Sequence, residues 1–535
     1  MSDRFEFTRW PEAVAETYRA KGYWRGETMG GMLKRLARMQ PDRMAVSDAS
    51  SRLTYAQLDA QADRVANGFQ SLGVAAGNRV VVQLPNSVRF LETLFGLFRL
   101  GALPVLALLS DRLSEITHVI QTSGAKAYVI QDQAQGFNYR QIAEEVSGLA
   151  PTLRHVIVAG EHGRFTPFEC LYGERVALPD RRPGDPVLIM LSGGSTALPK
   201  LIVRTHDDYL YSFTASAEIC QLDANSVYLC ALPAGHNFAL SSPGILGVLS
   251  AGGHVVMTTD PSSSAAFALI EQEKVTFTAL VPGLALAWLY TPCERRPDSL
   301  RFIQIGGAKL SAEVAERIMS TFGCALQQVF GMTEGLVCYT RLGDDIERVM
   351  NTQGLPISED DEIRIVDENG RDVPAGQGGQ LIVRGPYTIR SYLNAPEHNA
   401  RAFTDDGYYK TGDIVSRRPD GYLVVEGRLK DQVNRGGEKI SSEEVEGHLL
   451  AHPGVREAAI VAVQDEFLGE ASCAFVVHHK AHAMKASEIK AFMAGRGVAP
   501  FKIPDQIRFV PSLPKTPVGK IDKKELRKQI PESRD

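Results

Sequence analysis

Long apolar runs are missing from this 535-residue sequence, which has no stretch of the ~20 apolar residues that a membrane-spanning helix needs. The nearest candidate, residues 95–109, is interrupted by Arg99 and by a Gly-Ala-Leu-Pro break. The first ten residues, MSDRFEFTRW, mix charged and apolar side chains and lack the apolar core of a secretion signal. We therefore expect a cytoplasmic protein without a membrane partner.

Cysteine pairs and excess positive charge are also missing. The seven cysteines are scattered and include no C-x-x-C spacing, which disfavours a zinc finger and is typical of reduced, mostly buried thiols. The formal net charge is −5, so the whole-chain composition gives no indication of a nucleic-acid partner. The chain is too long for one compact core, which predicts two or more domains.

The pattern of apolar residues predicts an α/β protein. Buried-strand runs such as residues 80–84 alternate with segments of helical spacing such as residues 54–69, and this alternation indicates parallel sheets covered by helices. Alternating strands near residues 340–425 add a small β subdomain. We expect a large N-terminal domain of stacked mixed α/β sheets over residues 1–429, and a small α+β C-terminal domain over residues 430–535.

Residues 191–200, LSGGSTALPK, form the most informative single segment. They follow an apolar strand; glycines let backbone N–H groups approach an anion, and hydroxyls and a lysine add further donors. The segment is not a Walker A loop, because Lys200 follows Pro199 where that pattern has glycine. Alone, it is as typical of a plain surface connection as of a nucleotide site. The expected phosphate contacts are Ser192, Gly193, Gly194, Ser195, Thr196 and Lys200.

Five further motifs follow this loop in order. They are residues 306–310 (GGAKL), 329–335 (VFGMTEG), 409–413 (YKTGD), 427–437 (GRLKDQVNRGG) and 513–520 (LPKTPVGK). The ordered set resembles the adenylate-forming superfamily of acyl-CoA synthetases, luciferases and adenylation domains of nonribosomal peptide synthesis. The segment PAGHNFALSSPG, with FTRWPEAVAETYRAKGYW near the N-terminus and LIVRTHDDYLYS after the loop, narrows the resemblance to the stand-alone aryl acid-activating branch of siderophore biosynthesis.

The resemblance implies the acyl-adenylate synthetase fold and a reaction in two halves. The carboxylate of an aryl acid attacks the α-phosphate of ATP and releases pyrophosphate; a thiol then attacks the acyl carbon and releases AMP. The implied acid is 2,3-dihydroxybenzoate, the cofactors are ATP and Mg²⁺, and the acceptor is the phosphopantetheine thiol of an aryl carrier protein. Salicylate as the acid, free coenzyme A as the acceptor, and a nucleotide-binding pseudoenzyme are the alternatives.

The resemblance assigns nucleotide roles to residues of the later motifs. Glu334 is the expected Mg²⁺ ligand, since a hard cation prefers carboxylate oxygen, and Asp413 with Arg428 is expected at the ribose. Lys520 is expected to bridge the substrate carboxylate and the α-phosphate from its Pro/Gly-bounded loop. A surface charge, an Asx turn and a solvent lysine are the respective alternatives for Glu334, Asp413 and Lys520. The other expected ATP contacts are Gly307, Ala308, Lys309, Val329, Phe330, Gly331, Met332 and Thr333.

A hinge and a second conformation are further implications. Lys430 occupies the position at which this family reorients its small domain between the two half-reactions. Lys520 would then leave the site, and the segment that ends at Lys439 would enter, with Lys439 as a catalytic residue. A plain linker turn is the alternative. The expected pantetheine channel residues are Gly436 and Gly437, which let the arm pass close to the backbone.

The aryl pocket is expected around the PAGHNFALSSPG segment. Asn237 can donate and accept hydrogen bonds, which suits the ortho-hydroxyl of a benzoate, and Ser242 suits a 3-hydroxyl. Family members that prefer salicylate tend to carry cysteine at that second position. No aspartate lies beside Asn237 to hold an α-amino group, which disfavours amino acids, and His236 is either a gate or a structural neighbour. The expected pocket residues are His236, Asn237, Phe238, Ser242, Gly307 and Val337.

Ala197 in the phosphate loop departs from the family, which often has glycine there. Alanine adopts a positive φ only at a cost, so a loop that needs this conformation would hold pyrophosphate differently. This departure motivates the pseudoenzyme alternative. The retention of Glu334, Asp413, Arg428 and Lys520 argues against it.

Overall fold

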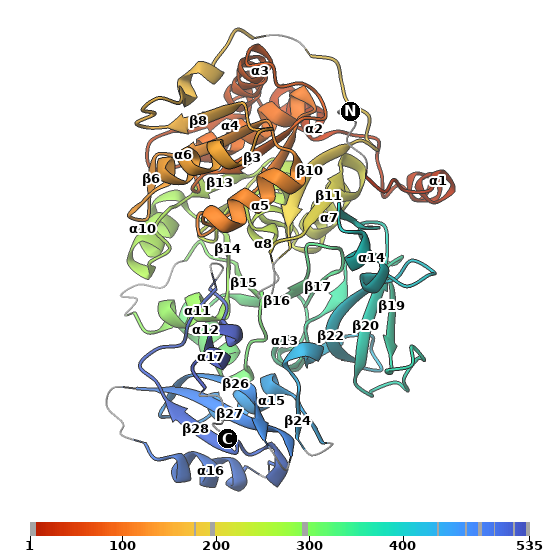
Figure 1. Cartoon of the computed structure of the whole chain (residues 1–535), viewed down its shortest axis with the longest axis vertical. Coiled ribbons are helices and arrows are strands. Elements are labelled where there is room, and N and C mark those ends of the chain that lie inside the picture. The colour runs from red at the N-terminus through yellow and green to blue at the C-terminus, as the bar shows by residue number, and fades with distance from the viewer. Residues whose placement is uncertain are drawn as a thin grey trace.

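The computed structural model describes residues 7–175, 178–192, 198–291, 298–435, 438–465, 468–479, 484–496, 498–516 and 519–530. Figure 1 shows a large N-terminal domain and, at one end of it, a small C-terminal domain in blue. Within the described residues, two large sheets, a four-stranded sheet and a two-stranded hairpin belong to the first domain, and one sheet belongs to the second. The predicted α/β fold is therefore confirmed. None of the described helices has the length and apolar character required to cross a membrane.

The first sheet contains eight described strands. In spatial order they are β21 (Tyr392–Leu393), β11 (Leu201–Thr205), β10 (Pro186–Leu191), β4 (Leu103–Leu106), β3 (Arg79–Gln83), β5 (Ala127–Gln131), β8 (His155–Ala159) and β9 (Thr166–Pro167). The strand predicted at residues 80–84 is β3, whose residues are all buried and which pairs in parallel with β4 and β5. Because β10 and β11 are antiparallel neighbours, the phosphate-loop segment begins and ends at one edge of the sheet.

The second sheet contains nine described strands. In spatial order they are β18 (Leu355–Pro356), β17 (Val337–Tyr339), β16 (Ala325–Gly331), β15 (Phe302–Gly306), β14 (Phe277–Leu280), β12 (Val227–Cys230), β13 (His254–Met257), β1 (Met44–Ser47) and β2 (Arg52–Thr54). β15 and β16 run in parallel, with Gly306 opposite Val329. The motifs GGAKL and VFGMTEG therefore meet at the carboxyl ends of adjacent strands, where ligands bind in parallel sheets.

The predicted β subdomain is an antiparallel sheet. Its strands are β19 (Glu362–Val366), β20 (Gly379–Arg384), β22 (Tyr409–Arg417) and β23 (Leu423–Arg428). The register of the last two strands places Asp413 opposite Arg428. Two residues that lie 15 positions apart are thus fixed side by side by backbone pairing. A separate short hairpin joins β6 (Gln133–Ala134) and β7 (Phe137–Asn138).

Helices cover the sheets of the N-terminal domain. The helix predicted from residue 54 begins there, because the Thr54 side chain accepts from the Gln57 N–H in a reciprocal capping box. The described helices are α1 (Glu12–Ala20), α2 (Met29–Met39), α3 (Tyr55–Ser71), α4 (Val88–Leu100), α5 (Leu113–Ser123), α6 (Tyr139–Leu149), α7 (His206–Ile219), α8 (Asn237–Ser241), α9 (Gly244–Ser250), α10 (Ser263–Glu273), α11 (Pro282–Leu289), α12 (Ala312–Phe322), α13 (Ile346–Asn351), α14 (Pro396–Ala402) and the 3₁₀ turn η1 (Phe168–Leu171).

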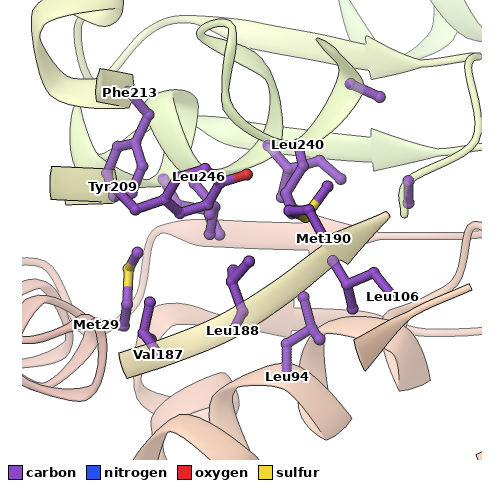
Figure 2. Packing of buried hydrophobic residues seen from close by; sticks show 14 of the residues in the cluster. Met29, Leu94, Leu106, Val187, Leu188, Met190, Tyr209, Phe213, Leu240 and Leu246 are labelled. Carbon is purple, nitrogen blue, oxygen red and sulfur yellow. The ribbon is translucent and has the colours of Figure 1, made fainter. Parts of the chain in front are cut away.

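The main hydrophobic core lies around β10. Figure 2 shows Leu188 and Met190 of this strand between Leu94 of α4 and the helices that carry Leu240 and Leu246. All five side chains are buried. Each contributes about 1.5–3 kcal/mol on transfer from water, so β10, which leads into the phosphate loop, and α8, which carries Asn237, are held firmly.

The C-terminal domain is a small α+β unit. It contains β25 (Glu438–Ile440), β24 (Val433–Arg435), β27 (Gly469–His478), β26 (Val455–Asp465), β28 (Gln506–Phe509), α15 (Ser442–Leu450), α16 (Ala486–Gly495), α17 (Lys523–Lys528) and η3 (Pro500–Lys502). The Ser441 hydroxyl donates to the Glu426 carbonyl of β23, which ties the start of α15 to the N-terminal domain. The boundary predicted after residue 429 falls in η2 (Leu429–Asp431), between β23 and β24, and stays a prediction.

Candidate active site

A cavity of about 1580 Å³ lies where the two domains meet. The N-terminal domain lines it with residues after β10, β12 and β15, including His236, Asn237 and Gly307. The C-terminal domain contributes Glu443 and Lys520. The structure thus brings the described ends of the phosphate loop, the PAGHNFALSSPG segment, the GGAKL motif and the last motif of the sequence to one cavity.

Lys520 extends from the C-terminal domain onto the backbone of Gly307. The Lys520 N–H donates to Thr516 Oγ1 over 3.1 Å, which helps to close its loop. A Cβ built on Gly307 would lie 3.2 Å from Lys520 Cε, and the φ of Gly307 is +85°. The positive φ therefore favours glycine there, and an added Cβ would press against the end of the Lys520 side chain. Burial, and next the charge of Arg428, lower the pKa of Lys520 to about 8.

Asp413 and Arg428 form an ion pair at the cavity edge. Arg428 Nε lies 2.7 Å from Oδ1 of Asp413, whose side chain is 3% exposed. The second oxygen, Oδ2, is buried and has no hydrogen-bond partner among the described residues. Burial raises the pKa of Asp413, while Arg428 lowers it. An orphaned acceptor of this kind fits the hydroxyl donors of a ribose.

Glu334 lies in the turn between β16 and β17. The Tyr392 hydroxyl donates to its Oε1 over 2.8 Å, and the Lys200 ammonium lies 5.4 Å from the centre of the Tyr392 ring. One tyrosine therefore connects the expected metal ligand with the phosphate-loop lysine. Tyr392 gave no signal in the sequence, because it reaches the site through the pairing of β21 with β11.

The phosphate loop is described only at its two ends. The Ser192 N–H donates to the Lys200 carbonyl over 2.9 Å, and the Lys200 N–H donates to Ser192 Oγ over 3.0 Å. The loop is thus closed by a reciprocal pair of bonds. The expected phosphate contacts Gly193, Gly194, Ser195 and Thr196, together with Ala197, lie outside the described residues.

The motifs GGAKL and VFGMTEG lie at the ends of the adjacent strands β15 and β16. Lys309 follows β15, and its ammonium donates to the Val425 carbonyl of β23 over 2.8 Å, so its side chain braces the β subdomain. Within VFGMTEG, a Cβ on Gly331 would lie 2.9 Å from the Leu336 carbonyl oxygen. The turn is close to the chain that returns as β17, which pairs Phe330 with Cys338. The remaining expected ATP contacts in these two motifs are Gly307, Ala308, Val329, Met332 and Thr333.

Arg204 belongs to the LIVRTHDDYLYS segment, but the sequence analysis assigned it no role in the site. It is 1% exposed, pairs with Asp208 over 2.7 Å, and donates to the Thr333 carbonyl over 3.0 Å. It therefore holds the turn that presents Glu334. The contact joins positions 129 apart in the chain, which no local pattern indicates.

Asn237 begins α8 and lines the cavity, and its carboxamide oxygen is already hydrogen-bonded within the protein. Its Oδ1 accepts from the Tyr209 hydroxyl over 2.9 Å and from Ser241 Oγ over 3.0 Å. We expected Asn237 to donate and to accept; the structure leaves only its amide hydrogens for a ligand, because two buried hydroxyls occupy the oxygen.

The rest of the expected aryl pocket surrounds this amide. Phe238 packs against Gly306, where a Cβ would lie 2.9 Å from its ring. Ser242 is 4% exposed and Val337 is 2% exposed. Tyr339 is fully buried, and its hydroxyl has no hydrogen-bond partner among the described residues.

His236 is the N-cap of α8. Its Nδ1 accepts from the Phe238 N–H over 3.3 Å, so the proton of the neutral ring is on Nε2. Burial, and next the charge of Lys520, lower the pKa of His236 to about 4. The imidazole is therefore neutral near pH 7. It has both a structural role as a cap and a donor available at the cavity.

The expected residues of the second conformation lie on the C-terminal side. Lys430 is in η2, and burial lowers its pKa while Asp431 raises it. The backbone of Lys439 pairs with Asn434 in the β24–β25 hairpin, and Arg435 pairs with Asp505 over 2.8 Å. The predicted channel residues Gly436 and Gly437 lie outside the described residues.

Glu443 is the C-terminal residue that sequence reasoning missed. It lines the cavity, and its Oε2 is buried without a hydrogen-bond partner in the described parts of the chain. Burial raises its pKa, and the charges of Lys523 and Lys309 lower it. The positive charges of Arg428 and the lysines at the cavity are thus partly balanced by a carboxylate from the C-terminal domain.

The fold and the site together define an ATP-using ligase of two domains. Residues 33–393 match the family described as AMP-binding enzyme, and residues 444–520 match the AMP-binding enzyme C-terminal domain. The chain belongs to the AMP-binding enzyme family, which confirms the resemblance drawn from the motifs.

Individual relatives are similar over nearly the whole chain. A 2,3-dihydroxybenzoate-AMP ligase of Bacillus subtilis is 56% identical, and the match covers 98% of each chain. A vibriobactin-specific 2,3-dihydroxybenzoate-AMP ligase of Vibrio cholerae is 47% identical, again over 98% of each. The apo structure of Mycobacterium smegmatis MbtA is 48% identical with a TM-score of 0.77, covering 98% of this chain and 99% of that one.

Proposed function

We propose that this protein activates 2,3-dihydroxybenzoate with ATP and passes the aryl group to the phosphopantetheine thiol of an aryl carrier protein in siderophore biosynthesis. The observation that carries the proposal is one cavity that combines the Asn237 amide with the ammonium of Lys520. The names of the Bacillus and Vibrio relatives support the choice of acid. The Ser242 hydroxyl supports 2,3-dihydroxybenzoate over salicylate, since it offers a partner for a 3-hydroxyl.

In the first half-reaction the protein orients the reactants and neutralises phosphate charge, and it forms no covalent bond to them. A carboxylate oxygen attacks the α-phosphorus of ATP, the bond to the bridging oxygen breaks, and pyrophosphate leaves. Lys520, placed on the Gly307 backbone, neutralises charge between the carboxylate and the α-phosphate. Asp413 holds the ribose through its free oxygen, and neutral His236 donates from Nε2 without adding charge.

A Mg²⁺ ion fits the Glu334 turn. One carboxylate oxygen accepts from Tyr392, which leaves the other for a hard cation. Among the described residues, no group of three His, Cys, Asp or Glu side chains gathers as a metal cage. Phosphate oxygens and water would complete the coordination, as is usual for Mg²⁺. When bound, the ion would neutralise charge on the phosphates.

The second half-reaction requires a different arrangement of the domains. We propose that the chain turns at Lys430, withdraws Lys520 and brings in the hairpin that carries Lys439, with Gly436 and Gly437 beside the pantetheine arm. The thiol sulfur then forms the thioester bond and AMP leaves. The C-terminal residues of this step and of the first step are on one small domain, so they exclude each other from the cavity.

ATP–pyrophosphate exchange by the purified protein with Mg²⁺ tests the proposal. The acids to compare are 2,3-dihydroxybenzoate, salicylate, benzoate and several amino acids. We expect 2,3-dihydroxybenzoate to give the highest kcat/KM. Exchange led by another acid would overturn the proposed substrate but not the chemistry, and absence of exchange with every acid would favour the pseudoenzyme.

A further inference from the structure

We infer that Tyr209 and Ser241 fix the carboxamide of Asn237 so that it can only donate a hydrogen bond to the 2-substituent of the aryl acid. The inference rests on the proposed function and adds to it two positioning residues and a rule for the substrate. The site accepts a hydrogen-bond acceptor at the 2-position and rejects a donor. Asn237 lines the cavity and is 8% exposed, so a ligand reaches its free amide hydrogens.

Tyr209 of α7 provides the first fixed bond. Its hydroxyl donates to Asn237 Oδ1 over 2.9 Å. The ring is fully buried in the cluster of Figure 2, with Phe213 edge-on at 6.1 Å and the Arg204 guanidinium 4.9 Å from the ring centre. Burial raises the pKa of the phenol to about 12, so it keeps its proton. A close-packed core prevents this hydroxyl from turning away.

Ser241 provides the second bond from one turn further along α8. It is fully buried, and its hydroxyl lies 3.0 Å from Asn237 Oδ1 and 3.2 Å from the Asn237 main-chain carbonyl. A carboxamide oxygen has two lone pairs. Tyr209 donates to one of them, and Ser241 directs its single proton between the other and the Asn237 main-chain carbonyl. Rotation of the carboxamide by half a turn would take the acceptor from the buried phenolic proton, which is costly. The N–H groups therefore remain toward the cavity.

This polarity distinguishes two acids of nearly equal size. In salicylate the phenolic proton bonds to the adjacent carboxylate, and the lone pairs of the phenolic oxygen accept from Asn237. In 2-aminobenzoate one N–H bonds to the carboxylate, and the other faces the amide hydrogens of Asn237. Donor then meets donor in a buried pocket. A pocket with a fixed polar partner discriminates strongly against an analogue that cannot pair with it.

Pyrophosphate exchange with salicylate, 2-aminobenzoate and benzoate tests this rule. In the unmodified protein, kcat/KM for salicylate should exceed that for 2-aminobenzoate by about 100-fold or more. In the variant that combines Tyr209→Phe with Ser241→Ala, the carboxamide can turn its oxygen to the ligand. The ratio should fall by about tenfold or more, while kcat/KM for benzoate, which has no 2-substituent, changes by less than about threefold.

Tyr211→Phe is the matched control. Tyr211 lies on the same helix, and its buried hydroxyl donates to Ser358 Oγ over 2.8 Å, away from Asn237. It should keep the ratio of the unmodified protein. The single variant Ser241→Ala repeats the test with a smaller perturbation and should lower the ratio.

Two results overturn the inference. Equal use of salicylate and 2-aminobenzoate by the unmodified protein would show that the amide is not a fixed donor. An unchanged ratio in both Ser241→Ala and the double variant would show that these hydroxyls do not position it. Either result leaves the proposed function intact, whereas absence of exchange with every aryl acid, 2,3-dihydroxybenzoate included, overturns both.

Discussion

At the scale of single residues, a substitution of Lys520 should affect the two half-reactions to different extents. Lys520→Ala should lower pyrophosphate exchange by about 100-fold or more, because it removes a preorganised charge from the developing phosphate centre. Transfer of the aryl group from supplied adenylate should stay within about threefold, since the proposed reorientation withdraws Lys520 from the cavity for that step. Rapid-quench assays of each half-reaction provide the measurement.

Lys515→Ala is the control for this variant. Lys515 lines the same cavity from the same loop, and its ammonium lies 3.0 Å from Glu457 Oε2. Its loss should leave both half-reactions nearly unchanged. Equal losses in the two halves for Lys520→Ala would contradict the two-conformation proposal.

The lowered pKa of Lys520 predicts an alkaline limit. Burial and the charge of Arg428 shift the pKa from 10.5 to about 8, and the protonated form is the active one. The kcat/KM for exchange should therefore decline as pH rises through about 8. The decline in kcat should come at higher pH, because bound phosphates favour the ammonium. Lys520→Arg should move the kcat/KM limit upward, since guanidinium stays protonated; an unmoved limit would assign the titration to another group.

A side chain at Gly307 would have two effects, backbone strain and contact with Lys520, which a pair of variants can separate. Gly307→Ala adds strain at a φ of +85° and a Cβ 3.2 Å from Lys520 Cε. We expect a loss of about 1–3 kcal/mol in the free energy of unfolding, and an exchange rate lower by about tenfold or more because Lys520 is displaced.

Gly77→Ala is the matched case, with a φ of +78° and no atom within 4 Å of the added Cβ. It should cost similar stability in denaturant titration and leave exchange unchanged. Loss of exchange in Gly77→Ala as well would trace the effect of Gly307→Ala to stability alone.

At the scale of elements, the sequence predicted the strands better than the neighbours of the site. The run at residues 80–84 and the helix from residue 54 correspond to β3 and α3, because burial period and a capping box are local signals. Asn237 and Lys520 were expected from motifs. Tyr209 was not, since its bond to Asn237 spans 28 positions and depends on how α7 packs against α8.

The start of α15 is an element whose cap does two things. Ser441 accepts from the Glu444 N–H over 3.3 Å and donates to the Glu426 carbonyl of β23. Ser441→Ala should cost about 1 kcal/mol of stability through the lost cap. It should also slow exchange by about threefold to tenfold, because the C-terminal domain loses an attachment that holds Lys520 in place.

Ser311→Ala in α12 offers the comparison. Ser311 is an N-cap that accepts from the Val314 N–H over 3.4 Å. It should show the same loss in thermal unfolding without the loss in exchange. Equal effects on exchange would mean that the bond to β23 has no part in positioning Lys520.

At the scale of the whole molecule, the described contacts between the C-terminal and N-terminal domains include one exposed ion pair and one ring contact, besides the hydrogen bond from Ser441 to Glu426. Arg496 lies 3.8 Å from Glu313, and the rings of Tyr290 and His479 are 5.5 Å apart. Exposed ion pairs of this kind contribute roughly 0–1 kcal/mol. The Arg496–Glu313 ion pair therefore opposes the proposed reorientation of the C-terminal domain only weakly.

Lys430→Pro should hold the molecule in one arrangement. Proline fixes φ near −65°, so a turn at this residue becomes unavailable. Exchange should stay within about fivefold, while transfer to the thiol acceptor should fall by about 100-fold, as in other gated steps. Lys430→Ala is the control and should retain both half-reactions. Full transfer activity in Lys430→Pro would place the hinge elsewhere.

The division of the cavity between two domains has an evolutionary consequence. Asn237, Tyr209 and Ser242, which we propose select the acid, all belong to the N-terminal domain, whereas Lys520 belongs to the C-terminal domain. Mutations that change the specificity for the aryl acid need not disturb the proposed alternation between the two half-reactions. Related proteins can thus evolve specificity for new aryl acids while they keep the same C-terminal domain and its lysine.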